Sequence, residues 1–473
     1  MQTGGLLSAE MLLHGLRIAE HELMLFALFW FVLGAFDELV IDLTWIWLRL
    51  TGRAATPRLA QDFAPAPLEG PMAVFFPAWR EAEVIGAAIS HTLKAWPQAE
   101  LRIYVGCYPN DSATVGAATA AIGGDRRARL VILDRAGPTT KADCLNRLYA
   151  ELRSDELRSG LRYRGVILHD AEDMVHPAGL EIIARALGEV DFVQLPVRPE
   201  PVRGSPYVAG HYCDEFTEAH AKGLVVRDAL GAAIPAAGVG CGFGREILEA
   251  LAALRRAEGG DGPFAAECLT EDYELGWLIA RLGGKSRFLR LRDAAGELVA
   301  TRAYFPATLE AAVRQKTRWV HGIAFQSWDR LGWSSRPVDI WMAIRDRRGP
   351  LTAIVLAMAY VWFAIWTVLA VAKAAGWQSA APQSLYWSAM LWITTGMLAW
   401  RGAVRMAFTA REYGPVEGLR ALPRLVVANV IAILASRQAV MAYLRALHGA
   451  PVVWDKTTHT LHPAQPAPGE VPG

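Results

Sequence analysis

Long apolar stretches are the feature of this sequence that most limits its possible folds. An α-helix needs about 20 mainly apolar residues to cross a bilayer, and runs of this kind occupy residues 23–41, 351–371 and 385–408. The chain has 473 residues, of which 53% are hydrophobic and 20% are charged. Membrane helices alone would not carry so much charge, so we expect them to be combined with a water-exposed domain.

Charged residues set the limits of the expected crossings. We expect the first crossing, over residues 23–41, to continue as an interfacial helix to residue 50, because its second half contains Asp37, Glu38 and Asp42. A fourth apolar segment, residues 422–447, carries polar residues at helical spacing, including Arg424 and Arg437. We interpret this segment as an amphipathic helix in the membrane interface rather than as a crossing.

Arginine residues predict the orientation of the chain. They follow the first crossing, precede the second and end the third: Arg49, Arg53, Arg58, Arg345, Arg347, Arg348, Arg401, Arg405 and Arg411. The positive-inside rule then places the large middle segment and the C-terminus in the cytoplasm, with three crossings. The cysteines show no C-x-x-C pairing, which is typical of reduced cytosolic thiols.

Between residues 69 and 336 short β-rich runs alternate with helical ones. The expected strands are 72–76, 101–106, 130–133, 165–169 and 192–195, and expected helices include 82–95 and 111–122. This alternation is typical of an α/β domain built on a mainly parallel sheet. The expected parts are a membrane and interfacial segment (1–50), a linker (51–68), the α/β domain (69–336), two membrane helices (337–410), the interfacial helix (411–450) and an unstructured cytoplasmic tail (451–473).

Polar residues follow several of the expected strands, at the edge of the sheet where α/β proteins bind ligands. Glu81 follows the first strand, Asp111 the second, and the cluster Asp170-Ala171-Glu172-Asp173 the fourth. Mg²⁺ is commonly held by one or two carboxylates together with substrate phosphates. The cluster therefore predicts a metal site, and the alternative is an acidic turn or helix start exposed to solvent.

A second acidic motif, Thr270-Glu271-Asp272, opens a helical stretch. One of its carboxylates could remove the proton from an acceptor hydroxyl. The alternative is a helix cap, because Thr and Asp are common at helix starts, where negative charge is favourable.

The third motif is Gln315-Lys316-Thr317-Arg318-Trp319, in the expected helix 309–331. Gln315, Arg318 and Trp319 are spaced to project from one face. That face offers an amide, a planar cation suited to phosphate and an aromatic ring suited to stacking on a sugar. The alternative is a cationic helix near lipid headgroups.

The order of these motifs is more informative than any one of them. Thr-Glu-Asp follows the acidic cluster by about a hundred residues, and Gln-x-x-Arg-Trp follows about forty residues later. This arrangement resembles the processive family 2 glycosyltransferases. Over about nine-tenths of its length the chain also resembles the NfrB-type family, known as bacteriophage N4 adsorption protein B, at residues 105–111, 141–146, 169–173, 237–240 and 454–459.

The resemblance implies a GT-A (Rossmann-like) catalytic domain on the cytoplasmic side of the bacterial inner membrane. It implies that a sugar is transferred from a UDP-sugar, such as UDP-N-acetylmannosamine or UDP-N-acetylglucosamine, with inversion of configuration at its anomeric carbon. The acceptor would be a growing exopolysaccharide or other envelope polysaccharide. The implied cofactor is Mg²⁺ or Mn²⁺, and the implied partners are the lipid bilayer and an export protein of the outer envelope.

The resemblance also implies residue roles. The metal would be held by Asp170, Glu172 and Asp173. Asp272, beside Glu271, would be the general base. The donor would be bound by Glu81, Asp111, Lys141, Gln315 and Arg318, and the acceptor would meet Trp319, Gly238, Gly240 and Cys241. The family usually has Asn after the first-strand Trp, where this chain has Arg80.

Two other function classes compete with this interpretation. A non-catalytic membrane receptor or scaffold would not need the acidic and Gln-x-x-Arg-Trp motifs. A glycoside hydrolase would use two carboxylates but has no use for a phosphate-binding arginine or a membrane anchor. The formal net charge of +1 gives no basic surplus for binding nucleic acid.

Overall fold

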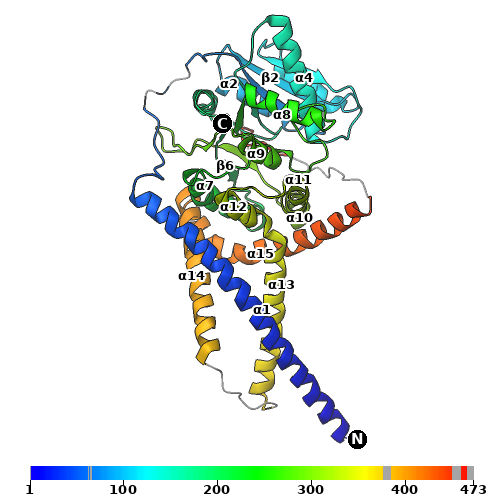
Figure 1. Cartoon of the computed structure of the whole chain (residues 1–473), viewed down its shortest axis with the longest axis vertical. Helices are drawn as coiled ribbons and strands as arrows, with labels where there is room; N and C mark the ends of the chain where they lie inside the picture. Colours follow the sequence, from blue (N-terminus) through cyan, green and yellow to red (C-terminus); the bar gives the residue numbers. More distant parts are fainter. Residues whose placement is uncertain (1, 62, 64–65, 377–384, 450–459, 466–473) are drawn as a thin grey trace.

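The protein is described here from a computed structural model, which covers residues 2–61, 63, 66–376, 385–449 and 460–465. A compact α/β part lies at one end, and long helices extend away from it (Figure 1). Residues 454–459, which carry part of the family resemblance, and the loop around residue 380 lie outside the described residues.

The α/β part is built on a seven-stranded sheet with the order β3-β2-β1-β4-β7-β5-β8. All neighbours pair in parallel except β7, which is antiparallel to β4 and β5. The strands are β1 (Met72–Pro77), β2 (Leu101–Cys107), β3 (Ala128–Ile132), β4 (Gly165–Leu168), β5 (Phe192–Gln194), β7 (Cys241–Gly244) and β8 (Ser286–Phe288). The expected mainly parallel sheet and its first five strands are confirmed, and β7 and β8 were not predicted.

Helices cover both faces of this sheet, which explains why its central strands read as unbroken apolar runs. Met72, Val74 and Phe76 of β1 point to one face, where they pack against α2 (Ile85–Ala95), α3 (Ser112–Ile122) and α5 (Gly179–Ala186). Ala73 and Phe75 point to the other face, against α4 (Lys141–Ser159), α8 (Arg245–Ala257) and α9 (Glu271–Arg281).

A second layer lies between this sheet and the long helices (Figure 1). It contains the parallel strand pair β6 (Val197–Glu200) and β9 (Thr301–Tyr304). Its helical segments are α6 (Val208–Glu218), η1 (Ala219–Gly223), α7 (Leu224–Ala229), α10 (Leu309–Val320), η2 (His321–Gln326), α11 (Ser327–Leu331) and α12 (Pro337–Arg347). The segments η1 and η2 are π-helical turns, which often mark functional sites within helices.

The N-terminal helix α1 (Gln2–Leu50) is continuous, and it includes both the expected crossing and the acidic stretch that follows it. Its acidic residues are neutralised by distant cations. Glu38 lies 2.9 Å from Arg345 and 3.0 Å from Arg401, and Asp42 lies 2.5 Å from Lys222. These pairs join α1 to α12, to α14 (Leu385–Tyr413) and to η1, and they allow the helix to continue through its charged half.

The C-terminal half holds α13 (Gly349–Ala374), α14 (Leu385–Tyr413) and α15 (Pro415–Leu447). By length and composition alone, the described helices that could cross a membrane are α1 from Met11 on, α13 and α15. In Figure 1, however, α13 and α14 extend away from the α/β part as α1 does, whereas α15 lies across them beneath the second layer.

Packing explains the position of α15. Ile431 and Ala435 of α15 are fully buried against Tyr212 of α6 and Ala312 of α10. The guanidinium of Arg424 is buried 3.0 Å from Asp214 of α6, and its Nε donates to the Pro206 carbonyl at 2.6 Å. A buried charge is stable only when it is paired in this way. The polar contacts of α15 therefore hold this helix against the second layer.

The C-terminal segment 460–465 differs from the expected unstructured tail. His462 is buried to 1% exposure, and its Nε2 donates to the Asp173 carbonyl at 3.0 Å. This part of the tail therefore packs against the α/β part, beside the acidic cluster.

Candidate active site

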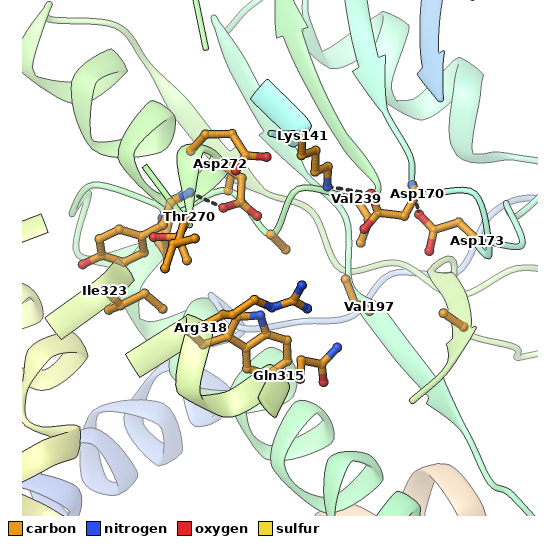
Figure 2. Close-up of a pocket in the computed structure, with 18 of the residues that line it drawn as sticks. Lys141, Asp170, Asp173, Val197, Val239, Thr270, Asp272, Gln315, Arg318 and Ile323 are labelled. Carbon is orange, nitrogen blue, oxygen red and sulfur yellow. Dashed lines mark hydrogen bonds and ion pairs between the residues drawn. The ribbon is translucent and has the colours of Figure 1, made fainter. Parts of the chain in front are cut away.

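The predicted motifs meet at one cavity of about 710 Å³, at the carboxyl ends of β1 and β4. Its lining includes Glu81, Lys141, Asp170, Glu172, Asp173, Glu271, Asp272, Gln315, Arg318 and Trp319. Figure 2 shows Gln315 and Arg318 facing Lys141, Asp170 and Asp272 across the open space. Segments far apart in the sequence thus supply opposite walls of one site.

The acidic cluster forms a tight loop in which its carboxylates differ in position. The Asp173 carboxylate is buried, and it accepts from the backbone N–H of Asp170 at 2.8 Å and from His169 Nδ1 at 3.1 Å. Burial lowers the pKa of His169 to about 3, so its ring is neutral. Burial also raises the pKa of Asp173 well above its usual value, as do Asp170 and Glu172. Asp173 therefore shapes the loop, whereas Asp170 and Glu172 are the accessible oxygen donors.

Lys141 is the first residue of α4, and a capping box fixes its position. The Thr140 hydroxyl accepts from the Asp143 N–H at 3.1 Å, and the Asp143 carboxylate accepts from the Thr140 N–H at 2.9 Å. Lys141 Nζ lies 2.6 Å from Asp170 Oδ1. Burial opposes its charge, but Asp170, Glu271 and Asp272 raise the pKa of Lys141 above its usual value. The site therefore holds a permanent cation between two groups of carboxylates.

The Thr-Glu-Asp motif begins α9, but the Thr270 side chain makes no capping hydrogen bond. Asp272 Oδ1 accepts from the Tyr273 N–H at 2.8 Å. Burial raises the pKa of Asp272, and Lys141 opposes that shift. Burial and the neighbouring Asp272 also raise the pKa of Glu271. Paired carboxyl groups of this kind are poised to exchange protons near neutral pH.

Gly238 determines where the Asp272 carboxylate can lie. Its φ is +74°, and a Cβ there would stand 2.4 Å from Asp272 Oδ2 and 3.3 Å from Lys141 Nζ. Only glycine combines this backbone conformation with that close approach. Gly238 therefore supports the carboxylate, whereas the sequence analysis placed it near the acceptor.

The Gln-x-x-Arg-Trp motif lies on α10, whose start is capped by the Thr308 hydroxyl, accepting from the Ala311 N–H at 3.3 Å. Gln315 lines the cavity, and its Oε1 is buried and has no hydrogen-bond partner within the described part of the chain. Such an atom is costly to bury unless a ligand binds it. Trp319 is held by Tyr212 and Phe216, with ring centroids 6.1 and 6.2 Å away.

Two features that the sequence analysis missed connect the motifs. The π-helical segment η2 brings Gly322 so close to the Thr-Glu-Asp motif that a Cβ on Gly322 would meet Thr270 Oγ1 at 2.3 Å. Gln326 then accepts from the Leu269 N–H at 2.9 Å. In addition, Asn146 holds the loop that precedes the Thr-Glu-Asp motif. Its Nδ2 donates to the Phe264 carbonyl at 2.8 Å, and its Oδ1 accepts from the Phe264 N–H at 3.0 Å. No local sequence signal indicates these partners.

Asp111, Gly240 and Cys241 do not line the cavity. Asp111 caps α3 through the Thr114 N–H and accepts from the Arg80 N–H at 2.6 Å, which helps to hold Arg80 at its φ of 56°. Gly240, at φ +59°, lies against the Thr301 hydroxyl, and Cys241 is buried as the first residue of β7. The unpredicted antiparallel strand draws Gly240 and Cys241 into the core.

The carboxylates present fit a divalent cation bound together with phosphates. Within the described residues, no three His, Cys, Asp or Glu side chains form a ready-made metal site. Mg²⁺ needs only one or two protein carboxylates when a diphosphate completes its ligands. Asp170 and Glu172 supply such a pair at the cavity wall, with the Asp170 side chain 33% exposed.

Comparison with known proteins identifies the family. Residues 70–322 match the model described as glycosyltransferase like family 2. The chain belongs to this family. The family match covers the sheet, the acidic loop, the Thr-Glu-Asp motif and α10, and thus the segments that line most of the described cavity.

Individual relatives agree with this family assignment. The bacteriophage adsorption protein B of Escherichia coli strain K12 is 32% identical over 485 residues, covering 94% of this chain and 62% of the relative. The bacteriophage N4 adsorption protein B of Escherichia coli O157:H7 gives the same values. The expected homology is confirmed, and the chain spans 62% of the length of these relatives.

A solved structure confirms the fold of this glycosyltransferase domain. The mannosyltransferase PcManGT from Pyrobaculum calidifontis, determined with GDP-Man and Mn²⁺, superposes with a TM-score of 0.51. The match covers 86% of this chain and 99% of that chain at 18% identity. The likeness thus extends beyond the sheet to most of the described chain, and it confirms the expected GT-A fold.

Proposed function

We propose that this protein transfers a sugar, with inversion, from a UDP-sugar to a growing envelope polysaccharide at the cytoplasmic face of the inner membrane. The observation that carries the proposal is the meeting of an acidic loop, a buried lysine, a second carboxyl pair and the α10 motif at one cavity. Each requirement of sugar transfer from a nucleotide donor has a matching group in that cavity.

The diphosphate of the donor would lie between Lys141 and Arg318. Lys141 is held charged by the surrounding carboxylates, and Arg318 faces it from α10 (Figure 2). Fixed cations in a preorganised site stabilise the negative charge that develops on a departing diphosphate. A divalent cation held by Asp170 and Glu172 would supply further Lewis-acid stabilisation of that leaving group. Gln315 Oε1, which has no hydrogen-bond partner among the described residues, would accept from the sugar or ribose.

Asp272 would remove the proton from the acceptor hydroxyl. Its raised pKa makes it a better proton acceptor than an ordinary aspartate, and Gly238 holds its carboxylate beside Lys141. Glu271, whose pKa is also raised, would share that proton as the second member of the pair. One base and no separate nucleophile imply a single displacement, and therefore inversion.

The acceptor would meet Trp319 on the membrane side of the cavity. This side is formed by α10, which packs on α15. We propose that α1, α13 and α14 cross the membrane and that α15 lies in its cytoplasmic interface, as its buried Arg424 and its position across the other helices favour. The acceptor would then be extended next to the bilayer, where an export partner of the outer envelope could receive it.

The name of the Escherichia coli relatives favours a second candidate, a receptor or scaffold used in phage adsorption. The two candidates differ in one measurement. Purified protein in detergent is incubated with Mn²⁺ or Mg²⁺ and a panel of donors, namely UDP-N-acetylmannosamine, UDP-N-acetylglucosamine, other UDP-sugars and GDP-mannose. Release of the nucleoside diphosphate, UDP or GDP, that depends on donor and metal supports transfer. No nucleotide release from any donor by folded protein refutes it and leaves the receptor.

A further inference from the structure

Residues 460–465 lie against two loops that carry the proposed donor-binding groups. The loop after β1 contains Glu81, and the loop after β4 contains Asp170 and Glu172. His462 Nε2 donates to the Asp173 carbonyl at 3.0 Å, and Gln465 Nε2 donates to the Glu83 carbonyl at 3.1 Å. The segment therefore bridges the two loops, and none of its residues lines the cavity.

The segment is built to present this histidine in one tautomer. His462 Nδ1 accepts from the Ala464 N–H at 3.0 Å, so in the neutral ring the hydrogen is on Nε2, where it is donated to Asp173. The Gln465 N–H donates to the His462 carbonyl at 2.9 Å, and Gln465 Oε1 accepts from the His462 N–H at 3.2 Å. Burial lowers the pKa of His462, which keeps the ring neutral.

Other hydrogen bonds hold the residues that follow Asp173 in the acidic loop, and His462 binds the Asp173 carbonyl itself. His91 Nε2 lies 2.9 Å from the Val175 carbonyl, and Met174 exchanges backbone hydrogen bonds with Arg302 at 2.8 and 2.9 Å. His462, at 1% exposure, thus completes a row of bonds along consecutive residues of the loop. A buried polar ring is stable in such a place only because its hydrogen bonds are made.

We propose that residues 460–465 act as a clamp on these two loops, and that His462 is a positioning residue for binding of the metal and the diphosphate. The clamp fixes the backbone at Asp173, and Asp173 in turn fixes the Asp170 N–H through its carboxylate. Loss of the His462 bond therefore frees the loop that carries Asp170 and Glu172. The effect of the clamp on binding of the metal and the diphosphate rests on the proposed function. Its effect on the order of the two loops does not.

The test compares His462→Ala with the wild type in the full-length protein in detergent. Hydrogen exchange is measured by mass spectrometry for peptides covering residues 170–176 and 81–85. Mn²⁺-dependent UDP binding is measured by calorimetry. We expect faster exchange in both peptides and UDP binding weakened roughly fivefold, the effect of losing one hydrogen bond. His462→Gln, which keeps an N–H donor, should recover part of both, and His448→Ala, at an exposed histidine of the helix end, should change neither.

Each outcome decides for or against the clamp. Unchanged exchange at residues 170–176 in folded His462→Ala overturns the proposal. Exchange that rises equally in β1 and β4 also overturns it, because His462 would then stabilise the whole sheet. If the wild type binds no UDP and turns over no donor, the proposed function fails, but the exchange comparison still decides whether the segment clamps the loops.

Discussion

The Asp272 carboxylate lies so close to Gly238 that a Cβ on the glycine would stand 2.4 Å from Asp272 Oδ2. A methyl group at this position must displace the carboxylate, because the glycine backbone is fixed at φ +74°. A substitution of Gly238 can therefore move the carboxylate of the proposed base without removing the base itself.

We therefore expect Gly238→Ala to lower kcat by roughly a hundredfold, since a misplacement of about 1 Å can have that effect. Donor KM should change little. Gly231→Ala is the matched control, because Gly231 also has a positive φ, +61°, but has nothing within 4 Å of an added Cβ. Equal losses in the two variants, measured by UDP release, would assign the effect to backbone strain and contradict the contact.

Asp272→Asn tests the base directly. The amide oxygen can still accept from the Tyr273 N–H, so the start of α9 should keep its structure. We expect kcat to fall by roughly two orders of magnitude or more, with UDP affinity unchanged by calorimetry. Turnover that persists near the wild-type rate would remove Asp272 from the mechanism and direct attention to Glu271.

The metal prediction concerns Asp170. Asp170→Asn removes the negative charge of a proposed metal ligand, and with it the ion pair to Lys141 at 2.6 Å. It should abolish Mn²⁺-dependent UDP binding, and EDTA should have the same effect on the wild type. Asp173→Asn is a contrasting variant, because the Asp173 carboxylate already accepts from the Asp170 N–H and from His169 within the loop, and we expect it to retain weak metal-dependent binding. Full activity in EDTA would exclude the metal role.

The raised pKa of Asp272 predicts a pH dependence. Burial favours its protonated form, so the group ionises and becomes a base at a higher pH than an ordinary aspartate does. We expect kcat/KM to increase with pH, with a midpoint above the usual aspartate value. A profile of kcat/KM from pH 5 to 9 is the measurement. A rate that is flat across this range would show that no buried carboxyl controls the step.

The proposed topology can be tested with introduced cysteines, because all native cysteines are buried and free. Gly376→Cys, at the end of α13, should react with a membrane-impermeant maleimide in intact cells. Gly449→Cys, just beyond α15, should react only after the cells are opened. Labelling of Gly449→Cys in intact cells would mean that α15 crosses the membrane, as its length and composition allow.

The sequence was sufficient to predict features that depend on local patterns. The parallel strands and the motifs at their carboxyl ends were predictable because apolar runs and polar strand ends are close in sequence. The strand β7 was not, because Cys241-Gly242-Phe243-Gly244 contains two glycines, which are unfavourable within strands. Its antiparallel insertion moved Gly240 and Cys241 from the predicted acceptor site into the core.

Features that depend on distant partners were also missed. The ion pairs of the acidic half of α1 were not predicted, because Lys222, Arg345 and Arg401 lie far along the chain. Similarly, nothing near His462 indicates that its partner is the carbonyl of Asp173, 289 residues earlier.

The packing of α10 on α15 has a mechanical consequence. Ala312 and Val313 of α10 are buried against Ile431 and Ala435 of α15, and the Thr317 hydroxyl lies 3.2 Å from Gln438 Oε1. If α15 lies in the headgroup layer as proposed, a change in its depth would lift or lower the wall of the cavity that α10 forms, including Trp319. The thickness and charge of the surrounding lipid would then set the height at which an incoming sugar chain must reach the base, so the bilayer itself becomes a determinant of which acceptors fit.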